Sequence, residues 1–102
     1  MNRSVIVLAL LVNSASAYPT EGIAMWGCAA EGGRRNVLYL ADRGSRSYVK
    51  FGTQRVTAAV TLTDSKRIWS FGNTSVELNE NGVAEYIEHG TLKSRFKCKL
   101  MQ

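Results

Sequence analysis

The chain is poor in the side chains that most catalytic and metal sites need. Its 102 residues include a single histidine, His89, and two cysteines, Cys28 and Cys98. No cluster has the spacing of metal ligands, and no Ser/His/Asp combination is available, so imidazole-based metal catalysis and most nucleophilic mechanisms lack their parts. A glycine-rich phosphate-binding loop is also missing. We therefore expect neither a metal ion nor an organic cofactor.

Long hydrophobic runs are missing as well. The unbroken apolar run at residues 5–12 is too short to cross a bilayer, which takes about 20 residues. Arg3 precedes this run, and an Ala-Ser-Ala triplet that ends at Ala17 follows it, which is typical of a secretory signal peptide with its cleavage site. Cleavage after Ala17 would leave residues 18–102 as one small domain. We predict a secreted or periplasmic protein without a membrane span.

Residues 18–102 show no convincing helix, and apolar and polar residues mostly alternate instead. This period of two, rich in β-branched residues, predicts half-buried strands. Residues 54–62 also fit a helical spacing, but their density of Val and Thr favours a strand. Turn-forming segments, most clearly Asn81-Gly82, separate the runs. The alternating runs are at residues 23–30, 35–41, 47–51, 55–63, 67–71, 75–78, 83–88 and 92–100. We predict an all-β fold, a small antiparallel barrel or sandwich of about seven or eight short strands.

The two cysteines lie near the two ends of the predicted domain. Cys28 and Cys98 each alternate in phase with apolar neighbours, so both should point into the core. In an oxidising compartment they would form a disulfide that ties the first strand to the last. On the chain-entropy model such a bridge stabilises the fold by about 4 kcal/mol. The alternative, a pair of ligating or redox-active thiols, would need neighbouring Cys or His residues that the sequence does not provide.

Charge is unevenly distributed along the chain. The sequence has 13 basic and 8 acidic residues and a net charge of +5. Residues 34–67 hold eight cations and two anions, residues 77–88 hold four anions, and residues 93–99 hold four cations. We expect a folded surface with separate basic and acidic patches, and a preference for anionic partners.

The last cationic block alternates along one face of a predicted strand, where same-face residues lie about 6.7 Å apart. That spacing is close to the distance between successive phosphates of an extended nucleic acid. We predict a binding surface that joins this row to the turns at residues 42–48 and 63–67. Its members are Lys93, Arg95, Lys97, Lys99, Arg43, Arg46, Lys66 and Arg67. Arg67 also shares a face with Trp69, which indicates a partly exposed aromatic and cationic patch. The alternative is that the lysines only keep a late strand soluble.

This pattern favours an exported, non-enzymatic and monomeric binding protein. Its cations would engage an anionic surface or the cleft of an enzyme, so that the partner is a protein or an anionic envelope polymer, with nucleic acid as a further candidate. In export signal, length and strand pattern the chain is similar to the small periplasmic inhibitors of c-type lysozymes. Their loop motif is Ser-Gly-x-x-Tyr, whereas here Gly44 precedes Ser45 before Tyr48. The resemblance implies a frame that inserts one loop into a cleft.

Two other functions compete with this interpretation. A small secreted ribonuclease would use Glu85 as general base, His89 as general acid and Arg95 to bind the phosphate. A two-residue hairpin loop would pair Glu85 with Ser94 and turn Glu85 toward the core. The third interpretation is a secreted effector or an envelope-structural protein. A glycosylation triplet begins at Asn73 and is relevant only in a eukaryotic source.

Overall fold

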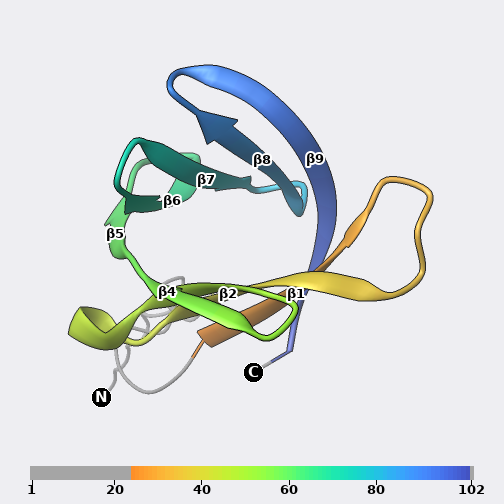
Figure 1. Ribbon diagram of the computed structural model, residues 1–102, viewed down its shortest axis with the longest axis horizontal. Coiled ribbons are helices and arrows are strands. Elements are labelled where there is room, and N and C mark those ends of the chain that lie inside the picture. Colours follow the sequence, from red (N-terminus) through yellow and green to blue (C-terminus); the bar gives the residue numbers. More distant parts are fainter. Residues whose placement is uncertain (1–23, 102) are drawn as a thin grey trace, which may run out of the picture.

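The computed structural model describes residues 24–101, and within that range it contains nine strands in one antiparallel sheet (Figure 1). The predicted signal peptide lies outside the described residues. The strands are β1 (Ala24–Ala30), β2 (Asn36–Asp42), β3 (Tyr48–Phe51), β4 (Gln54–Thr57), β5 (Ala59–Leu62), β6 (Lys66–Phe71), β7 (Thr74–Asn79), β8 (Val83–Glu88) and β9 (Thr91–Leu100). Their order in the sheet is β4-β3-β2-β1-β9-β8-β7-β6-β5. The predicted all-β class is confirmed. No helix in the described part of the chain has the length and apolar character needed to span a bilayer.

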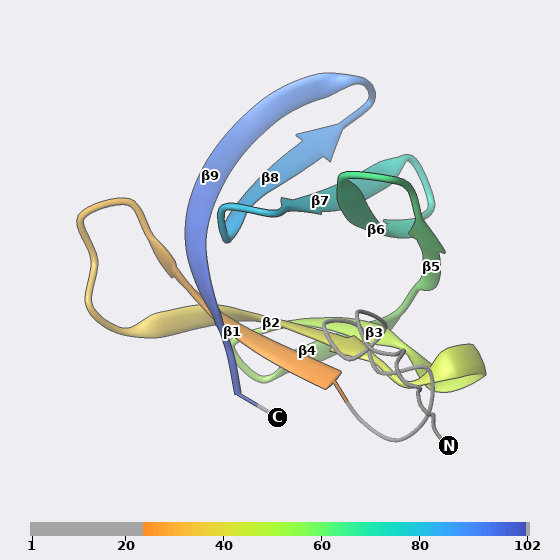
Figure 2. The ribbon, with the colours of Figure 1, turned by 180° about the vertical axis from the view of Figure 1, so that it is seen from behind.

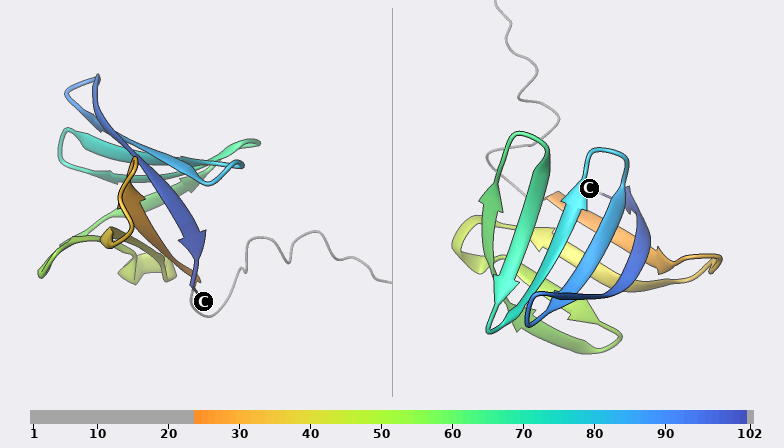
Figure 3. Two further views of the ribbon diagram at one scale, coloured as in Figure 1. Left: turned by 90° about the vertical axis from the view of Figure 1, so that its right-hand side faces the viewer. Right: turned by 90° about the horizontal axis from the view of Figure 1, so that it is seen from above.

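The sheet curls into a nearly closed barrel. Strands β1 to β4 form one layer and β5 to β8 the other, and the long strand β9 curves from one layer to the other (Figure 1). The first part of β9 pairs with β8 and its last part pairs with β1. Figure 2 and Figure 3 show the hairpin between β1 and β2 projecting from the barrel. Strand β9 therefore closes the barrel on one side, opposite the link between β4 and β5.

The strand predicted at residues 55–63 divides into two at Ala58, which brings the number of strands to nine. Before this residue, Val56 pairs with Val49 of β3, and after it Val60 pairs with Trp69 of β6. Ala58 is itself buried, and its N–H donates to the carbonyl of Ser47 at 3.0 Å. The alternation of apolar residues continues through Ala58, so the sequence pattern shows no sign that the chain changes layers there.

Two tryptophans join the layers. The rings of Trp26 and Trp69 meet edge to face with their centroids 5.6 Å apart. The indole N–H of Trp69 donates to the carbonyl of Ala41 at 2.9 Å, across the core from β6 to β2. The buried residues around them are mostly small or aliphatic, namely Ala24, Cys28, Leu38, Leu40, Val49, Ala58, Val76, Leu78 and Ala84. The inner faces of both layers are therefore buried in one shared core.

The disulfide between Cys28 and Cys98 is present, as the sequence predicts. The two residues are direct partners of β1 and β9, and their Cα atoms are 4.0 Å apart. Both side chains face the core, where Cys28 is fully buried. The bridge therefore fastens the pairing of the first and last strands.

Tyr86 gives the fold a dependence on alkaline pH. Its ring packs against Phe51 at 5.2 Å, and burial together with the neighbouring Glu88 carboxylate raises its pKa above the ordinary 10.0. The stability that comes from the raised pKa is present below about pH 10 and is lost as the pH rises through the folded-state value. Tyr86→Phe should therefore unfold at a higher pH than the unmodified protein in a circular dichroism titration. Identical alkaline midpoints would contradict this expectation.

Candidate anion-binding site

The cationic row on β9 lies on the outside of the barrel. Lys93, Arg95, Lys97 and Lys99 are all exposed, whereas the alternate residue Phe96 is buried in the core. Arg95 forms an ion pair with Glu85 of β8, with its Nε 3.1 Å from a carboxylate oxygen. Within the described range the three lysines take part in no ion pair. The lysines therefore keep their charge available for a ligand, and Arg95 is already partly neutralised.

Lys97 and Lys99 line a groove between β9 and the β1–β2 hairpin. The groove has a volume of about 510 Å³, and its lining residues are Gly27, Ala29, Gly33, Arg34, Asn36, Lys97 and Lys99. Gly27 is the cross-strand partner of Lys99, and Ala29 is the partner of Lys97. Small residues thus form the floor beside the two lysines, and the Asn36 amide and the Met101 sulfur lie over Gly27.

The hairpin forms the other wall of the groove. It does so because the pairing of β1 and β2 is irregular near the turn that joins the two strands. The register shifts between Cys28 and Ala29, so that Ala29 pairs with Asn36, and such a bulge bends the strands locally. A methyl group on Gly27 would lie 2.5 Å from Nδ2 of Asn36, which shows how closely that amide lies over the floor. Glycine at this position is therefore what permits Asn36 to close the groove.

The charge around the groove has one sign. Arg34, Lys97 and Lys99 line it, and none of its lining residues is acidic. In residues 24–57 and 91–101 the acidic side chains are Glu31 and Asp42, and Asp42 is bound by Arg67 inside the barrel. The glutamates of residues 77–88 belong to the other layer and its turns. Because β9 lies beside β1, the two basic blocks of the sequence meet on one face.

Two of the turn cations predicted for the binding surface have other positions. Arg67 is only 1% exposed and lies inside the barrel, with its NH1 nitrogen 3.1 Å from Asp42 and its guanidinium 4.8 Å from the ring centre of Trp26. The predicted surface role of Arg67 and the exposed patch with Trp69 are therefore wrong, because both residues have the inward phase of β6. Lys66 points outward but forms a 2.8 Å ion pair with Glu77.

The other turn cations, Arg43 and Arg46, lie around a short 3₁₀ turn between β2 and β3, and Arg46 is exposed. This turn follows the last residue of β2, while the groove lies at the first. The seven residues of β2 separate the two places by roughly 20 Å. The structure therefore does not join this turn to the groove.

The residues of the ribonuclease interpretation are only partly brought together. A register shift between Tyr86 and Ile87 pairs Glu85 with Arg95, not with Ser94. The prediction that Glu85 faces the core is therefore wrong, since a slip of one residue turns a strand side chain to the other face. His89 is exposed in the turn after β8 with a φ of 52°. It lies four residues from Glu85 along the chain, roughly 13 Å at strand spacing.

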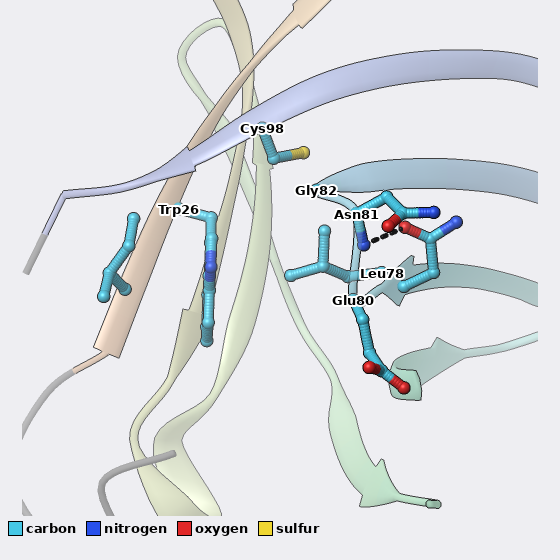
Figure 4. A pocket seen from close by; sticks show the side chains of 8 residues that line it. Trp26, Leu78, Glu80, Asn81, Gly82 and Cys98 are labelled. Carbon is cyan, nitrogen blue, oxygen red and sulfur yellow. Dashed lines mark hydrogen bonds between the residues drawn. The ribbon is translucent and has the colours of Figure 1, made fainter. Parts of the chain in front are cut away.

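A second hollow lies beside the disulfide (Figure 4), with a volume of about 300 Å³. Trp26 and Leu78 flank it, and the turn between β7 and β8 supplies its polar rim. Asn79 in that rim already accepts hydrogen bonds from the N–H groups of Asn81 at 2.9 Å and Val83 at 3.1 Å. The charged residue in the lining is Glu80, so this hollow does not attract anions. Among residues 24–101 there is no group of three His, Cys, Asp or Glu residues able to hold a metal ion.

Arg34 and Asn36 line the groove but are not among the residues that the sequence predicts for the binding surface. Their only sequence signal is the glycine-rich turn that precedes them, and that turn does not show on which side of the sheet the hairpin lies. No protein-family model, curated protein or solved structure matches the chain.

Proposed function

We propose that this is an exported, non-enzymatic binding protein that holds an anionic ligand in the groove between β9 and the β1–β2 hairpin. The observation that carries the proposal is the set of Arg34, Lys97 and Lys99 around a floor of small residues, with no acidic residue in the lining. The amide of Asn36 adds a neutral hydrogen-bond donor. The disulfide supports export, because such bridges persist in oxidising compartments.

The groove differs in charge balance from the other basic places on the protein. Lys66 and Arg95 each have a glutamate partner, so a ligand there would have to compete with a carboxylate of the protein. Lys97 and Lys99 have no such competitor within the described range. Single exposed ion pairs contribute up to about 1 kcal/mol each. Several cations around one ligand are therefore needed for useful affinity, and binding should weaken as salt rises.

We expect the double variant Lys97→Gln/Lys99→Gln to bind a compact polyanion about tenfold more weakly, since two such contacts are lost. Sucrose octasulfate is a suitable probe because its charges are dense and it is small enough to stay within the groove. Isothermal titration calorimetry at low salt, with the oxidised protein, measures the effect.

The matched control is Arg46→Gln/Lys93→Gln, which removes the same charge from two exposed residues outside the groove lining. It should bind sucrose octasulfate within about twofold of the unmodified protein, because screening limits the influence of distant charges. Equal losses in the two double variants would mean that net charge alone attracts the anion. Binding of unsulfated sucrose with the same affinity would contradict the proposal as well.

The ribonuclease alternative has less support. It requires a general acid close to the pair formed by Glu85 and Arg95, and the single histidine lies at the far end of β8. Glu85 is moreover engaged by the cation that was expected to bind the phosphate. These positions favour a binding function over an RNA-cleaving one.

A further inference from the structure

A row of cross-strand partners starts in the groove and crosses five strands. Each member is the direct partner of the next, on β9, β1, β2, β3 and β4 in turn. The row consists of Lys99, Gly27, Tyr39, Lys50 and Arg55. Direct partners on adjacent strands point to the same side of a sheet. The alternate residues Leu38, Leu40 and Val49 are buried in the core, so the row lies on the outer face.

The row is long enough for an extended ligand. Strands lie about 4.8 Å apart, so the backbones at Lys99 and Arg55 are separated by roughly 19 Å. Lys50 lies between these two, and Lys97 lies beside Lys99 about 6.7 Å along β9. Within the described range, neither Lys50 nor Arg55 takes part in an ion pair. A linear ligand crossing the strands from the groove would therefore meet four uncompensated cations in succession.

Tyrosine rings support the distal cations. The Lys50 ammonium lies 5.6 Å from the centre of the Tyr39 ring, and the Arg55 guanidinium lies 4.0 Å from that of Tyr48. Such cation–π contacts hold flexible side chains in place on the surface. They also cover ring faces that a nucleic-acid base would need for stacking, which is the main base contact of single-strand binders. The row therefore suits a ligand bound through charges and hydroxyl groups.

On the premise of the proposed function, we infer that the ligand is a linear glycan bearing sulfate or phosphate esters, which extends from the groove across Tyr39 to Lys50 and Arg55. The ester groups meet the cations at both ends of the row. The glycan hydroxyl groups between them can bond to Asn36 and to the Tyr39 phenol. The Asn36 amide and the Met101 sulfur lie over Gly27, so the sugar rings would pass over these two side chains and not against the backbone of β1.

The test compares a long and a short probe on one variant, Lys50→Gln/Arg55→Gln. Sucrose octasulfate, which reaches only the groove, should bind this variant within about twofold of the unmodified protein. A heparin octasaccharide should bind about tenfold more weakly. The slope of the logarithm of its binding constant against the logarithm of salt concentration should become shallower by roughly one to two. A phosphomannan fragment of equal length shows whether phosphate esters serve as well as sulfates. Far-UV circular dichroism confirms that the variant is folded.

The outcomes separate this inference from the proposed function. Loss of octasaccharide binding in the Lys50/Arg55 variant, with sucrose octasulfate binding kept, supports the inference. Unchanged octasaccharide binding in that variant, with loss in the Lys97/Lys99 variant, overturns the inference and leaves the groove standing. Tighter binding of an oligothymidylate of equal charge than of either glycan overturns the ligand class. Unchanged binding of every probe by the Lys97/Lys99 variant overturns both proposals.

Discussion

The double variant Cys28→Ala/Cys98→Ala should lose about 4 kcal/mol of unfolding free energy relative to the oxidised protein, because the bridge closes a loop of 70 residues. Small domains have a total stability of about 5–15 kcal/mol, so the variant should be close to unfolding at ordinary temperature. The bridge fastens β1 to β9, the one strand pairing in the described sheet that joins elements far apart in the chain. Urea denaturation followed by tryptophan fluorescence measures the change.

Two controls identify the origin of this loss. The unmodified protein in the presence of a reductant should unfold at nearly the same urea concentration as the double variant, since both lack the cross-link. The loss should also come mainly from the unfolded state, so the folded alanine variant should keep its near-ultraviolet circular dichroism spectrum. A stability change of less than about 1 kcal/mol would show that the cross-link does little for this fold.

The second large effect is expected at the ion pair between Arg67 and Asp42. Arg67 is 1% exposed, and Asp42 places a carboxylate oxygen 3.1 Å from its NH1 nitrogen. Asp42→Asn should cost about 3–5 kcal/mol, because it removes the negative charge that lies beside a buried guanidinium. Thermal and urea denaturation of the variant measure this loss.

A neighbouring ion pair supplies the matched control. Lys66 and Glu77 form a bond of similar length at the surface, with 43% of the Lys66 side chain exposed. Lys66→Gln should cost less than about 1 kcal/mol, because exposed pairs gain little from Coulomb attraction in water. In contrast, Arg67→Met/Asp42→Leu should recover much of what Asp42→Asn loses, since it removes both charges and keeps apolar volume. A small effect of Asp42→Asn would show that other groups balance the Arg67 charge.

Alternation was a reliable guide to the faces of β1, β6 and β9. In β9 it correctly separated the buried Phe96 from the exposed lysines, and it placed Cys28 and Cys98 on facing inner positions. The same alternation placed Arg67 on the face of Trp69. The error there was to assume that a charged residue must lie outside. An acidic partner from a different strand made the burial of Arg67 tolerable, and nothing in the sequence around residue 67 identifies that partner.

Irregular pairing was beyond prediction for a related reason. Glu85 changed face because β8 and β9 slip by one residue between Tyr86 and Ile87, and Asn36 reached the groove through the slip between Cys28 and Ala29. A bulge arises from how two strands fit against the rest of the barrel. Neither slip leaves a mark in the order of polar and apolar residues. The slip between Cys28 and Ala29 nevertheless determines which side chains surround the groove.

The local order of residues thus decided which segments become strands, which side of most strands is apolar, and where along the chain positive charge collects. These properties depend on neighbours one or two positions apart, so a linear sequence contains them fully. The pairing of β9 with β1 joins Lys97 and Lys99 to the hairpin and to the row that ends at Arg55. That pairing depends on the curvature of the whole sheet and on a core shared by both layers. Both of these exist only in the folded chain.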